Sequence, residues 1–314
     1  MKKRRKIIMD MDIGDDIDDA IALYAAMRQD FDIIGITTVF RNTVERARMA
    51  KKLLLTYGRG YENVPVFAGY GTPMGAAALP ARHTPHYTPD LEDERYIPNG
   101  TAPEKAIDFI IDACRKYGKE LTVIAIGPFT NIAYAIQKGP EALNLCDKVA
   151  IMGGAYYKQY ADWNVICDVT AADIMFKGLK NLECLGADVT HLMVGEQALY
   201  ANLLDYQGSE PGHRYLTELC RLWKTDRPNA KLLLHDPLVI YYVADPSICT
   251  MKAADVVVMT EGYSKGMTLN VDAYGKRWLN TEAYQNHDET HKALVALAAN
   301  RESFNSRILA DFDT

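Results

Sequence analysis

The stretch that decides the fold lies close to the start of the chain. Residues 6–20 read Lys6-Ile7-Ile8-Met9-Asp10-Met11-Asp12-Ile13-Gly14-Asp15-Asp16-Ile17-Asp18-Asp19-Ala20. The apolar run at residues 6–9 predicts a short buried strand, and the apolar positions from Ala20 to Met27 recur at the spacing of one helix face. The acidic residues between them form a loop. Such a strand–loop–helix unit is the building block of a parallel sheet that is covered by helices.

The same alternation continues along the rest of the chain. Further strands are predicted at residues 33–39, 64–68, 121–126, 148–152, 184–189 and 256–260. Helices are predicted at residues 44–57, 104–117, 130–138, 171–178, 194–204, 212–224, 237–243 and 289–309. This order predicts an α/β fold, with a Rossmann-like, mostly parallel central sheet and helices on both faces. No repeat, linker or change in composition interrupts the pattern, so we expect a single domain over residues 1–314.

Composition and charge exclude several classes of protein. The 314 residues are 48% apolar and 24% charged, which is ordinary for a globular protein. The net charge of −6 argues against binding to nucleic acid, which favours clustered positive charge. Because no run of about 18 apolar residues occurs, we expect no membrane span. The six cysteines contain no CxxC pair, and Asp10 interrupts the apolar start too early for a secretory signal, so we expect a cytoplasmic protein.

The acidic loop predicts a cation site. Six carboxylates fall within residues 10–19, at the carboxyl end of a strand, which is where parallel sheets bind ligands. Like charges crowded at a buried strand end repel unless a cation neutralises them, and Ca²⁺ and Mg²⁺ prefer such oxygen ligands. Far along the chain, His235-Asp236-Pro237 offers one more carboxylate with a histidine beside it. The same triplet also fits a plain helix start, with Pro237 at the first helical position.

Several short motifs in a fixed order resemble one known family. They are Asp10-x-Asp12-x-Gly14 with Asp18-Asp19-Ala20, Ile36-Thr37-Thr38-Val39 with Asn42, Gly127-x-x-Thr130-Asn131-Ile132-Ala133, Met152-Gly153-Gly154, Asp162-Trp163-Asn164 and His235-Asp236-Pro237. In this order the chain resembles, over nearly its whole length, the inosine-uridine type of nucleoside hydrolase. The resemblance implies the fold of that family. It also implies an enzyme of purine or pyrimidine salvage that uses water to cleave ribonucleosides into ribose and free base.

The resemblance also implies a cofactor and a set of site residues. Ca²⁺ would be held by Asp12, Asp19, Asp236 and the backbone carbonyl of Ile126. Asp12 would act as general base on a Ca²⁺-bound water, and His235 would protonate the leaving base. The residues implied to bind substrate are Asp18, Asn42, Met152, Asp162, Asn164 and His235. Asp10 would orient the metal ligands, and the family is commonly a homodimer or homotetramer.

The chain departs from the family pattern at three places. Two extra residues stand between Gly14 and the Asp18-Asp19 pair, so Asp16 stays a possible metal ligand. Arg41 occupies the place of a glycine, and Asp162 that of a glutamate, which shortens the reach toward the ribose 5′-hydroxyl by one methylene. These departures leave the preferred base open and would suit a modified or larger nucleoside.

The sequence also allows two other functions, a non-catalytic binder and a phosphatase. A non-catalytic binder of ribose or nucleosides would use the same residues. A phosphatase of the haloacid-dehalogenase type would use Asp10 as nucleophile and Asp12 as general acid, but it needs Gly-Thr directly afterwards, where Ile13-Gly14 stands.

Four aromatic residues would either stack on a base or pack in a loop, and packing is preferred for each of them. They are Tyr156, Tyr157, Tyr160 and Trp163. The remaining histidines, at positions 83, 86, 191, 213, 287 and 291, are predicted to be surface or structural residues.

Overall fold

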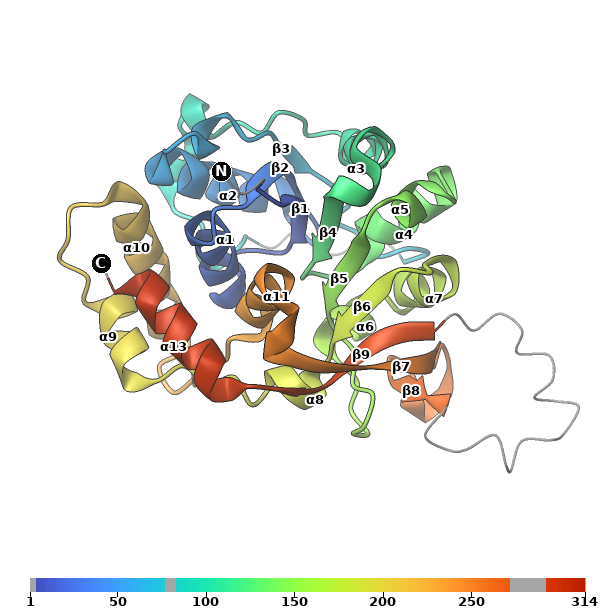
Figure 1. Ribbon diagram of the computed structural model, residues 1–314. Coiled ribbons are helices and arrows are strands. Elements are labelled where there is room, and N and C mark those ends of the chain that lie inside the picture. The colour runs from blue at the N-terminus through green and yellow to red at the C-terminus, as the bar shows by residue number, and fades with distance from the viewer. Residues whose placement is uncertain (1–3, 77–82, 272–291, 314) are drawn as a thin grey trace, which may run out of the picture.

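A nine-stranded sheet forms the centre of the protein (Figure 1). The structure is a computed structural model and describes residues 4–76, 83–271 and 292–313. The strands are β1 (Lys6–Met11), β2 (Asp32–Thr38), β3 (Val66–Ala68), β4 (Leu121–Ala125), β5 (Lys148–Met152), β6 (Leu182–Leu185), β7 (Cys249–Val258), β8 (Thr268–Asn270) and β9 (Lys292–Ala299). Their order is β3-β2-β1-β4-β5-β6-β9-β7-β8. All neighbours from β3 to β9 are parallel, whereas β7 is antiparallel to both β9 and β8.

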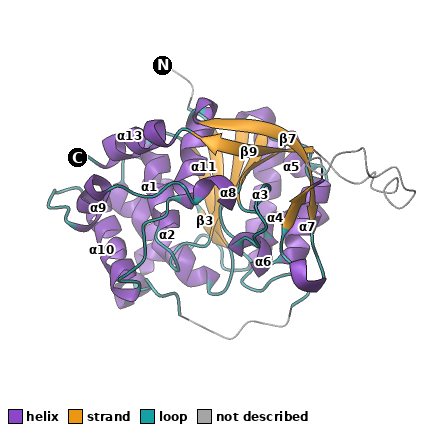
Figure 2. Cartoon of the chain, turned by 90° about the horizontal axis from the view of Figure 1, so that it is seen from below, coloured by secondary structure: helices purple, strands orange, loops and turns teal. Residues whose placement is uncertain are grey.

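Helices cover both faces of this sheet (Figures 1 and 2). They are α1 (Asp18–Arg28), α2 (Thr43–Tyr57), α3 (Pro103–Tyr117), α4 (Thr130–Lys138), α5 (Ala142–Leu145), α6 (Trp163–Cys167), α7 (Val169–Gly178), α8 (Ala187–Thr190), α9 (Gln197–Leu204), α10 (Pro211–Asp226), α11 (His235–Ala244) and α13 (Arg301–Phe312). One face carries α1, α2, α10, α11 and α13, and the other carries α3, α4 and α7. Each face of the sheet has its own apolar core. Ile7 and Met9 of β1 belong to the core that includes α1, and Ile8 belongs to the core that includes α3, as expected for a strand buried on both faces. The predicted fold class is confirmed.

The C-terminal part of the prediction is wrong. The sequence favoured one helix over residues 289–309, but residues 292–299 form strand β9, and helix α13 begins only at Arg301. Ala293, Val295 and Ala296 are buried in this strand between β6 and β7, whereas Leu294 and Leu297 remain partly exposed. Pairing with two neighbouring strands outweighs the helix preference of the alanine- and leucine-rich sequence, which is only a weak local tendency. Residues 289–291 lie outside the described part of the chain.

The segment after β6 also differs from the prediction. The strand expected over residues 184–189 ends at Leu185, and the short helix α8 follows from Ala187. Gly186 makes this turn possible, because a Cβ atom there would lie 2.9 Å from the Gly154 carbonyl oxygen and 2.8 Å from the Tyr156 ring. The Ala187 N–H then donates to the Gly154 carbonyl at 2.7 Å. The turn brings the segment after β6 against the segment after β5.

The chain contains no apolar helix of membrane-spanning length within residues 4–76, 83–271 and 292–313.

The turn between β2 and α2 carries the first testable prediction. Asn42 is the N-cap of α2, and its side-chain oxygen accepts from the Glu45 N–H at 3.4 Å. Replacing it with alanine leaves that N–H without its cap and should lower the free energy of unfolding by about 0.5–1 kcal/mol. Urea denaturation measures this change. Asn63→Ala, at an exposed position, is the matched control, and an equal effect of both substitutions would contradict the capping role.

Candidate active site

A cavity of about 410 Å³ lies where the loops after several parallel strands meet. Its lining residues are Asp12, Asp15, Asp16, Asp18, Arg41, Ile126, Met152, Tyr160, Asp162, Trp163, Asn164, His191, Arg227, His235 and Asp236. Asp12 follows β1, Ile126 follows β4, and Met152 ends β5. This position at the carboxyl ends of the strands is the one that the sheet topology predicts for a ligand site.

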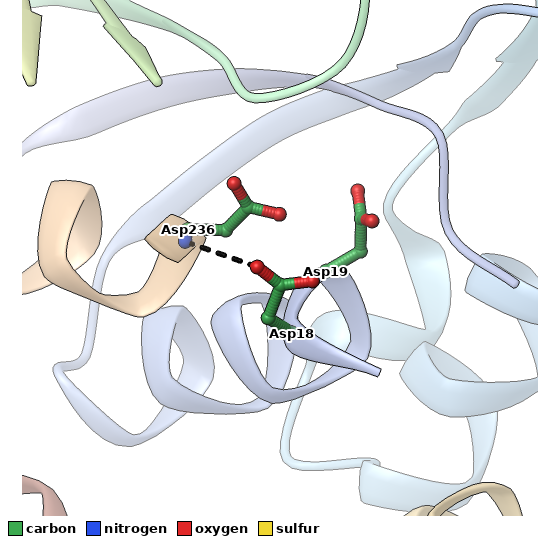
Figure 3. Close-up of side chains that lie close together, drawn as sticks. All are labelled: Asp18, Asp19 and Asp236. Carbon is green, nitrogen blue, oxygen red and sulfur yellow. Dashed lines mark hydrogen bonds between the residues drawn. The ribbon is translucent and has the colours of Figure 1, made fainter. Parts of the chain in front are cut away.

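Three buried carboxylates lie close together (Figure 3), and two of them, Asp18 and Asp236, line the cavity. Asp18 and Asp19 come from the first turn of α1, and Asp236 comes from the start of α11, so more than two hundred positions of sequence separate them. One carboxylate oxygen of each lies within 4.8 Å of the others, and the Asp236 N–H donates to Asp18 Oδ2 at 3.5 Å. Burial raises the pKa of each carboxyl well above 3.8, and repulsion between the neighbouring carboxylates raises it further.

Asp12 lies beside this cluster. Its side chain is buried, and its backbone N–H donates to Asp19 Oδ1 at 3.0 Å, which joins the end of β1 to the start of α1. Burial raises the pKa of the Asp12 carboxyl to about 6, while the Arg46 guanidinium lowers it and the Asp15 carboxylate raises it. The arrangement therefore crowds carboxyl groups together where little of their surface is exposed to solvent.

The donor set fits a hard cation. Carboxylate and carbonyl oxygens are the ligands that Ca²⁺ and Mg²⁺ prefer, and burying several carboxylates together is costly without a cation. The Ile126 carbonyl lies at the same cavity, where it accepts from Asn164 Nδ2 at 2.8 Å, and a carbonyl oxygen has a second lone pair for a metal. Asp12, Asp19, Asp236 and this carbonyl would hold the ion.

Asp10 lies behind the ligands and does not line the cavity. Its Oδ1 atom accepts from Thr37 Oγ1 at 2.6 Å and from Asn131 Nδ2 at 2.7 Å, whereas its buried Oδ2 atom has no hydrogen-bond partner in the described structure. Burial raises the pKa of Asp10 to about 7, although both of these hydrogen bonds lower it. A fully buried carboxylate held in this way has no access to a phosphate ester, which argues against the phosphatase alternative.

Two carboxylates of the acidic loop, Asp15 and Asp16, form ion pairs with arginines. Asp15 Oδ2 pairs with Arg46 Nη2 at 2.7 Å, and Asp16 Oδ2 pairs with Arg227 Nη1 at 2.7 Å. Arg46 is fully buried and also donates to the backbone carbonyls of the loop at Asp12 and Ile13. The carboxylate cluster formed by the described residues contains Asp18, Asp19 and Asp236, and neither Asp12 nor Asp16 is part of it. Asp12 lies beside this cluster, whereas the Asp16 carboxylate is paired with Arg227.

Three rings follow one another along a wall of the cavity. His235 Nδ1 is 2.7 Å from Thr190 Oγ1, and the His235 ring centroid is 5.0 Å from that of His191. The Tyr160 ring lies 5.4 Å from His191. Burial and the nearby His191 lower the pKa of His235 to about 4. The sequence predicted a surface or structural role for His191 and packing for Tyr160, yet both line the cavity. No local motif marks the turn at Gly186 that precedes His191.

Of the remaining residues predicted to bind substrate, three line the cavity and one does not. Asp162 Oδ1 caps α6 by accepting from the N–H groups of Asn164 at 3.0 Å and Val165 at 3.4 Å. Burial raises the pKa of Asp162 to about 6. Asp162, Asn164 and Met152 line the cavity. Asn42 is not among the lining residues, since its side chain caps α2, and Arg41 lines the cavity from the same turn.

Comparisons with known proteins identify the family of the chain. The family described as inosine-uridine preferring nucleoside hydrolase matches residues 7–306. An enzyme of that description from Leishmania major is 30% identical over 84% of this chain and 87% of its own length. Uridine nucleosidase 1 of Arabidopsis thaliana is 28% identical over 88% of this chain and 84% of its own length. The solved structure of a plant nucleoside hydrolase superimposes with a TM-score of 0.81 at 26% identity and covers 99% of both chains.

The chain therefore belongs to the inosine-uridine preferring nucleoside hydrolase family. It is an enzyme of the N-glycosidase class, which acts on ribonucleosides. The family resemblance that the short motifs indicated is thus confirmed.

Proposed function

We propose that this enzyme cleaves ribonucleosides to ribose and free base with the help of Ca²⁺ held by Asp12, Asp19, Asp236 and the Ile126 carbonyl. The observation that carries the proposal is the buried cluster of Asp18, Asp19 and Asp236 beside a cavity that also contains His235. When bound, Ca²⁺ would neutralise these carboxylates and fix the ribose 2′- and 3′-hydroxyls.

The carboxylates have different roles in the reaction at the ribose. Asp12 takes a proton from the attacking water, since its carboxyl is buried at the cavity and its pKa of about 6 leaves it mostly ionised at neutral pH. Breaking the glycosidic bond places positive charge on the ribose ring, and the Asp18 carboxylate stabilises that charge. Asp10, held by Thr37 and Asn131, orients the segment that carries Asp12.

Other residues position the nucleoside. The 5′ end of the ribose lies against Asp162 and Asn164, and Met152 packs against the sugar. His235 faces the base. When the Thr190 hydroxyl donates to His235 Nδ1, the Nε2 atom carries the proton, and the neutral ring donates a hydrogen bond from Nε2 to the leaving base, which stabilises the charge that develops there. The resemblance implies that Asn42 binds the substrate. To do so, its side chain would have to leave the N-terminus of α2, which it caps.

Release of ribose is the direct test of this proposal. The enzyme is incubated with a panel of purine and pyrimidine ribonucleosides, with Ca²⁺ and with a chelator, and reducing sugar is measured. We expect ribose release with Ca²⁺ and its loss with the chelator, restored by added Ca²⁺. Full activity after exhaustive chelation would refute the role of the ion. Nucleoside binding in a thermal-shift assay without any turnover would instead identify a non-catalytic binder.

Thr190 provides a prediction for the histidine. Thr190→Val removes the hydroxyl that holds His235 Nδ1 and should lower kcat by about tenfold with little change in KM, whereas Thr190→Ser should retain most of the activity. Initial rates with one nucleoside measure both constants. Thr217→Val is the matched control, because Thr217 is buried and its hydroxyl has no partner among the described residues. Equal losses in the valine and serine variants would contradict a role for the hydroxyl.

A further inference from the structure

The turn after β2 has an unusual backbone. Phe40 has a φ angle of +70° and Arg41 one of +58°, so two consecutive residues that are not glycine adopt the left-handed conformation. For such residues this conformation is unfavourable, because Cβ approaches the following carbonyl oxygen. Backbone strain of this kind persists only where the surroundings hold it, and it is concentrated at functional sites.

Three hydrogen bonds hold the turn. The Phe40 N–H donates to the Tyr70 carbonyl at 2.9 Å, and the Arg41 N–H donates to the Gly71 carbonyl at 2.7 Å. Buried Arg46 donates from Nε to the Phe40 carbonyl at 2.8 Å. Position 71 requires glycine, since a Cβ atom there would lie 2.1 Å from the Arg41 carbonyl oxygen. The neighbouring segments therefore impose this conformation on the turn.

The turn directs the side chains of the adjacent residues Arg41 and Asn42 to different places. Asn42 turns toward α2 and caps it, while the Arg41 side chain reaches the cavity. Its guanidinium lies over the Phe40 ring, with Cζ 5.0 Å from the ring centroid, and makes an ion pair at the cavity. The ion pair from Arg41 Nη1 to Asp15 is long, at 4.0 Å, whereas Arg46 already binds the same Asp15 oxygen at 2.7 Å. Arg41 thus keeps hydrogen-bond donors available for a ligand.

Arg41 and Asp162 line the same cavity, and the residues next to them in sequence are in contact. The Phe40 ring packs edge-on against the Trp163 ring, with centroids 6.5 Å apart, which joins the β2–α2 turn to the start of α6. The Asp162 carboxylate is meanwhile occupied in capping α6.

We propose that Arg41 is a specificity-determining residue that binds the oxygen at the 5′ position of the ribose. This inference rests on the proposed function, in which the 5′ end lies against Asp162 and Asn164. Arginine offers several N–H donors on a long side chain. The Asp162 carboxylate caps α6, and Arg41 offers the 5′ oxygen a hydrogen-bond donor in the same cavity. The bound group is the neutral hydroxyl, because Asp12, Asp15 and Asp162 line the same cavity and would repel a 5′-phosphate.

A substrate-and-variant cycle tests the proposal. Wild type and Arg41→Ala are each assayed for kcat/KM with a ribonucleoside and with its 5′-deoxy analogue. A hydrogen bond from a charged donor predicts that wild type prefers the ribonucleoside by about tenfold or more, and that Arg41→Ala reduces this preference to about twofold or less. Arg41→Lys should fall between them, since lysine keeps the charge but loses the planar fork. The 5′-monophosphate should be a poorer wild-type substrate than the nucleoside.

Matched variants separate this role from general effects on the turn. Arg48 lies on α2, outside the cavity, and donates to the Leu91 carbonyl at 2.7 Å, so Arg48→Ala should leave the preference unchanged. An unchanged preference in Arg41→Ala, its loss in Asn42→Ala instead, or better cleavage of the 5′-monophosphate would overturn the proposal. Should wild type release no ribose, the proposed function fails. The same cycle, measured as binding by calorimetry, then decides the role of Arg41 separately.

Discussion

Replacing Asp12 with asparagine is expected to lower kcat for ribonucleosides by about 10²–10⁴-fold, which is the range that general-base catalysis contributes. Asparagine has nearly the same shape but cannot accept a proton from water. Because the Asp12 backbone N–H, and not its side chain, binds Asp19, the join between β1 and α1 should survive the substitution. Initial rates of ribose release, together with thermal unfolding, measure the two effects separately.

Control variants make this prediction specific. Asp108→Asn changes an exposed carboxylate on α3 that pairs with Lys138, and it should leave kcat unaltered. Calcium titration of Asp12→Asn shows whether its loss of rate comes only from weaker metal binding. Near-saturating Ca²⁺ that restored full activity would contradict the role of Asp12 as a base. A loss of less than about tenfold at saturating Ca²⁺ would have the same meaning.

Removal of the divalent cation should make the stability of the protein fall with rising pH. Burial raises the pKa of Asp12 to about 6 and that of Asp10 to about 7, from an ordinary value of 3.8. A carboxyl whose pKa is raised in the folded state binds protons more tightly there than in the unfolded chain. Its stabilising contribution is full below about pH 4 and is lost as the pH rises through 6–7. Metal-free enzyme should therefore unfold at a lower temperature at pH 8 than at pH 5.

Calcium should reverse that loss, and most strongly at high pH. A ligand present at about 100 times its dissociation constant stabilises the folded state by about 2.7 kcal/mol. Thermal melts at pH 5 and pH 8, with Ca²⁺ and with chelator, measure the effect. Asp236→Asn is the informative variant, since it removes one charge from the cluster. It should raise the stability of the metal-free protein at pH 8 and abolish the response to Ca²⁺. A chelator that left the melting temperature at pH 8 unchanged would count against a bound ion.

The acidic site was predictable because its residues stand in short, ordered motifs. Asp12, Asp18, Asp19 and Asp236 were named from the sequence, and the structure brings them to one end of the sheet. Strand alternation placed Asp12 at the carboxyl end of β1, and two like-charged segments that meet there predict a cation. The roles assigned to these residues remain predictions until the variants are assayed.

What the sequence did not reveal depends on contacts between distant segments. Residues 292–299 follow a helix-like pattern locally and become a strand only because β6 and β7 flank them. Arg41 reaches the cavity because the carbonyls of Tyr70 and Gly71 hold the turn after β2 in a left-handed conformation. His191 lies at the site because Gly186 allows close approach to Gly154. Each of these contacts joins segments that are distant in sequence.

The interior position of β9 has a consequence for synthesis of the chain. Every carboxylate of the acidic cluster has been translated once Asp236 is made, yet the sheet stays open between β6 and β7 until Lys292–Ala299 follows. At about 5–20 residues per second the ribosome needs seconds to cover that interval. During this time β6 presents an unpaired edge that can recruit other strands. The nascent enzyme therefore carries its complete set of acidic ligands before the framework that supports them is closed.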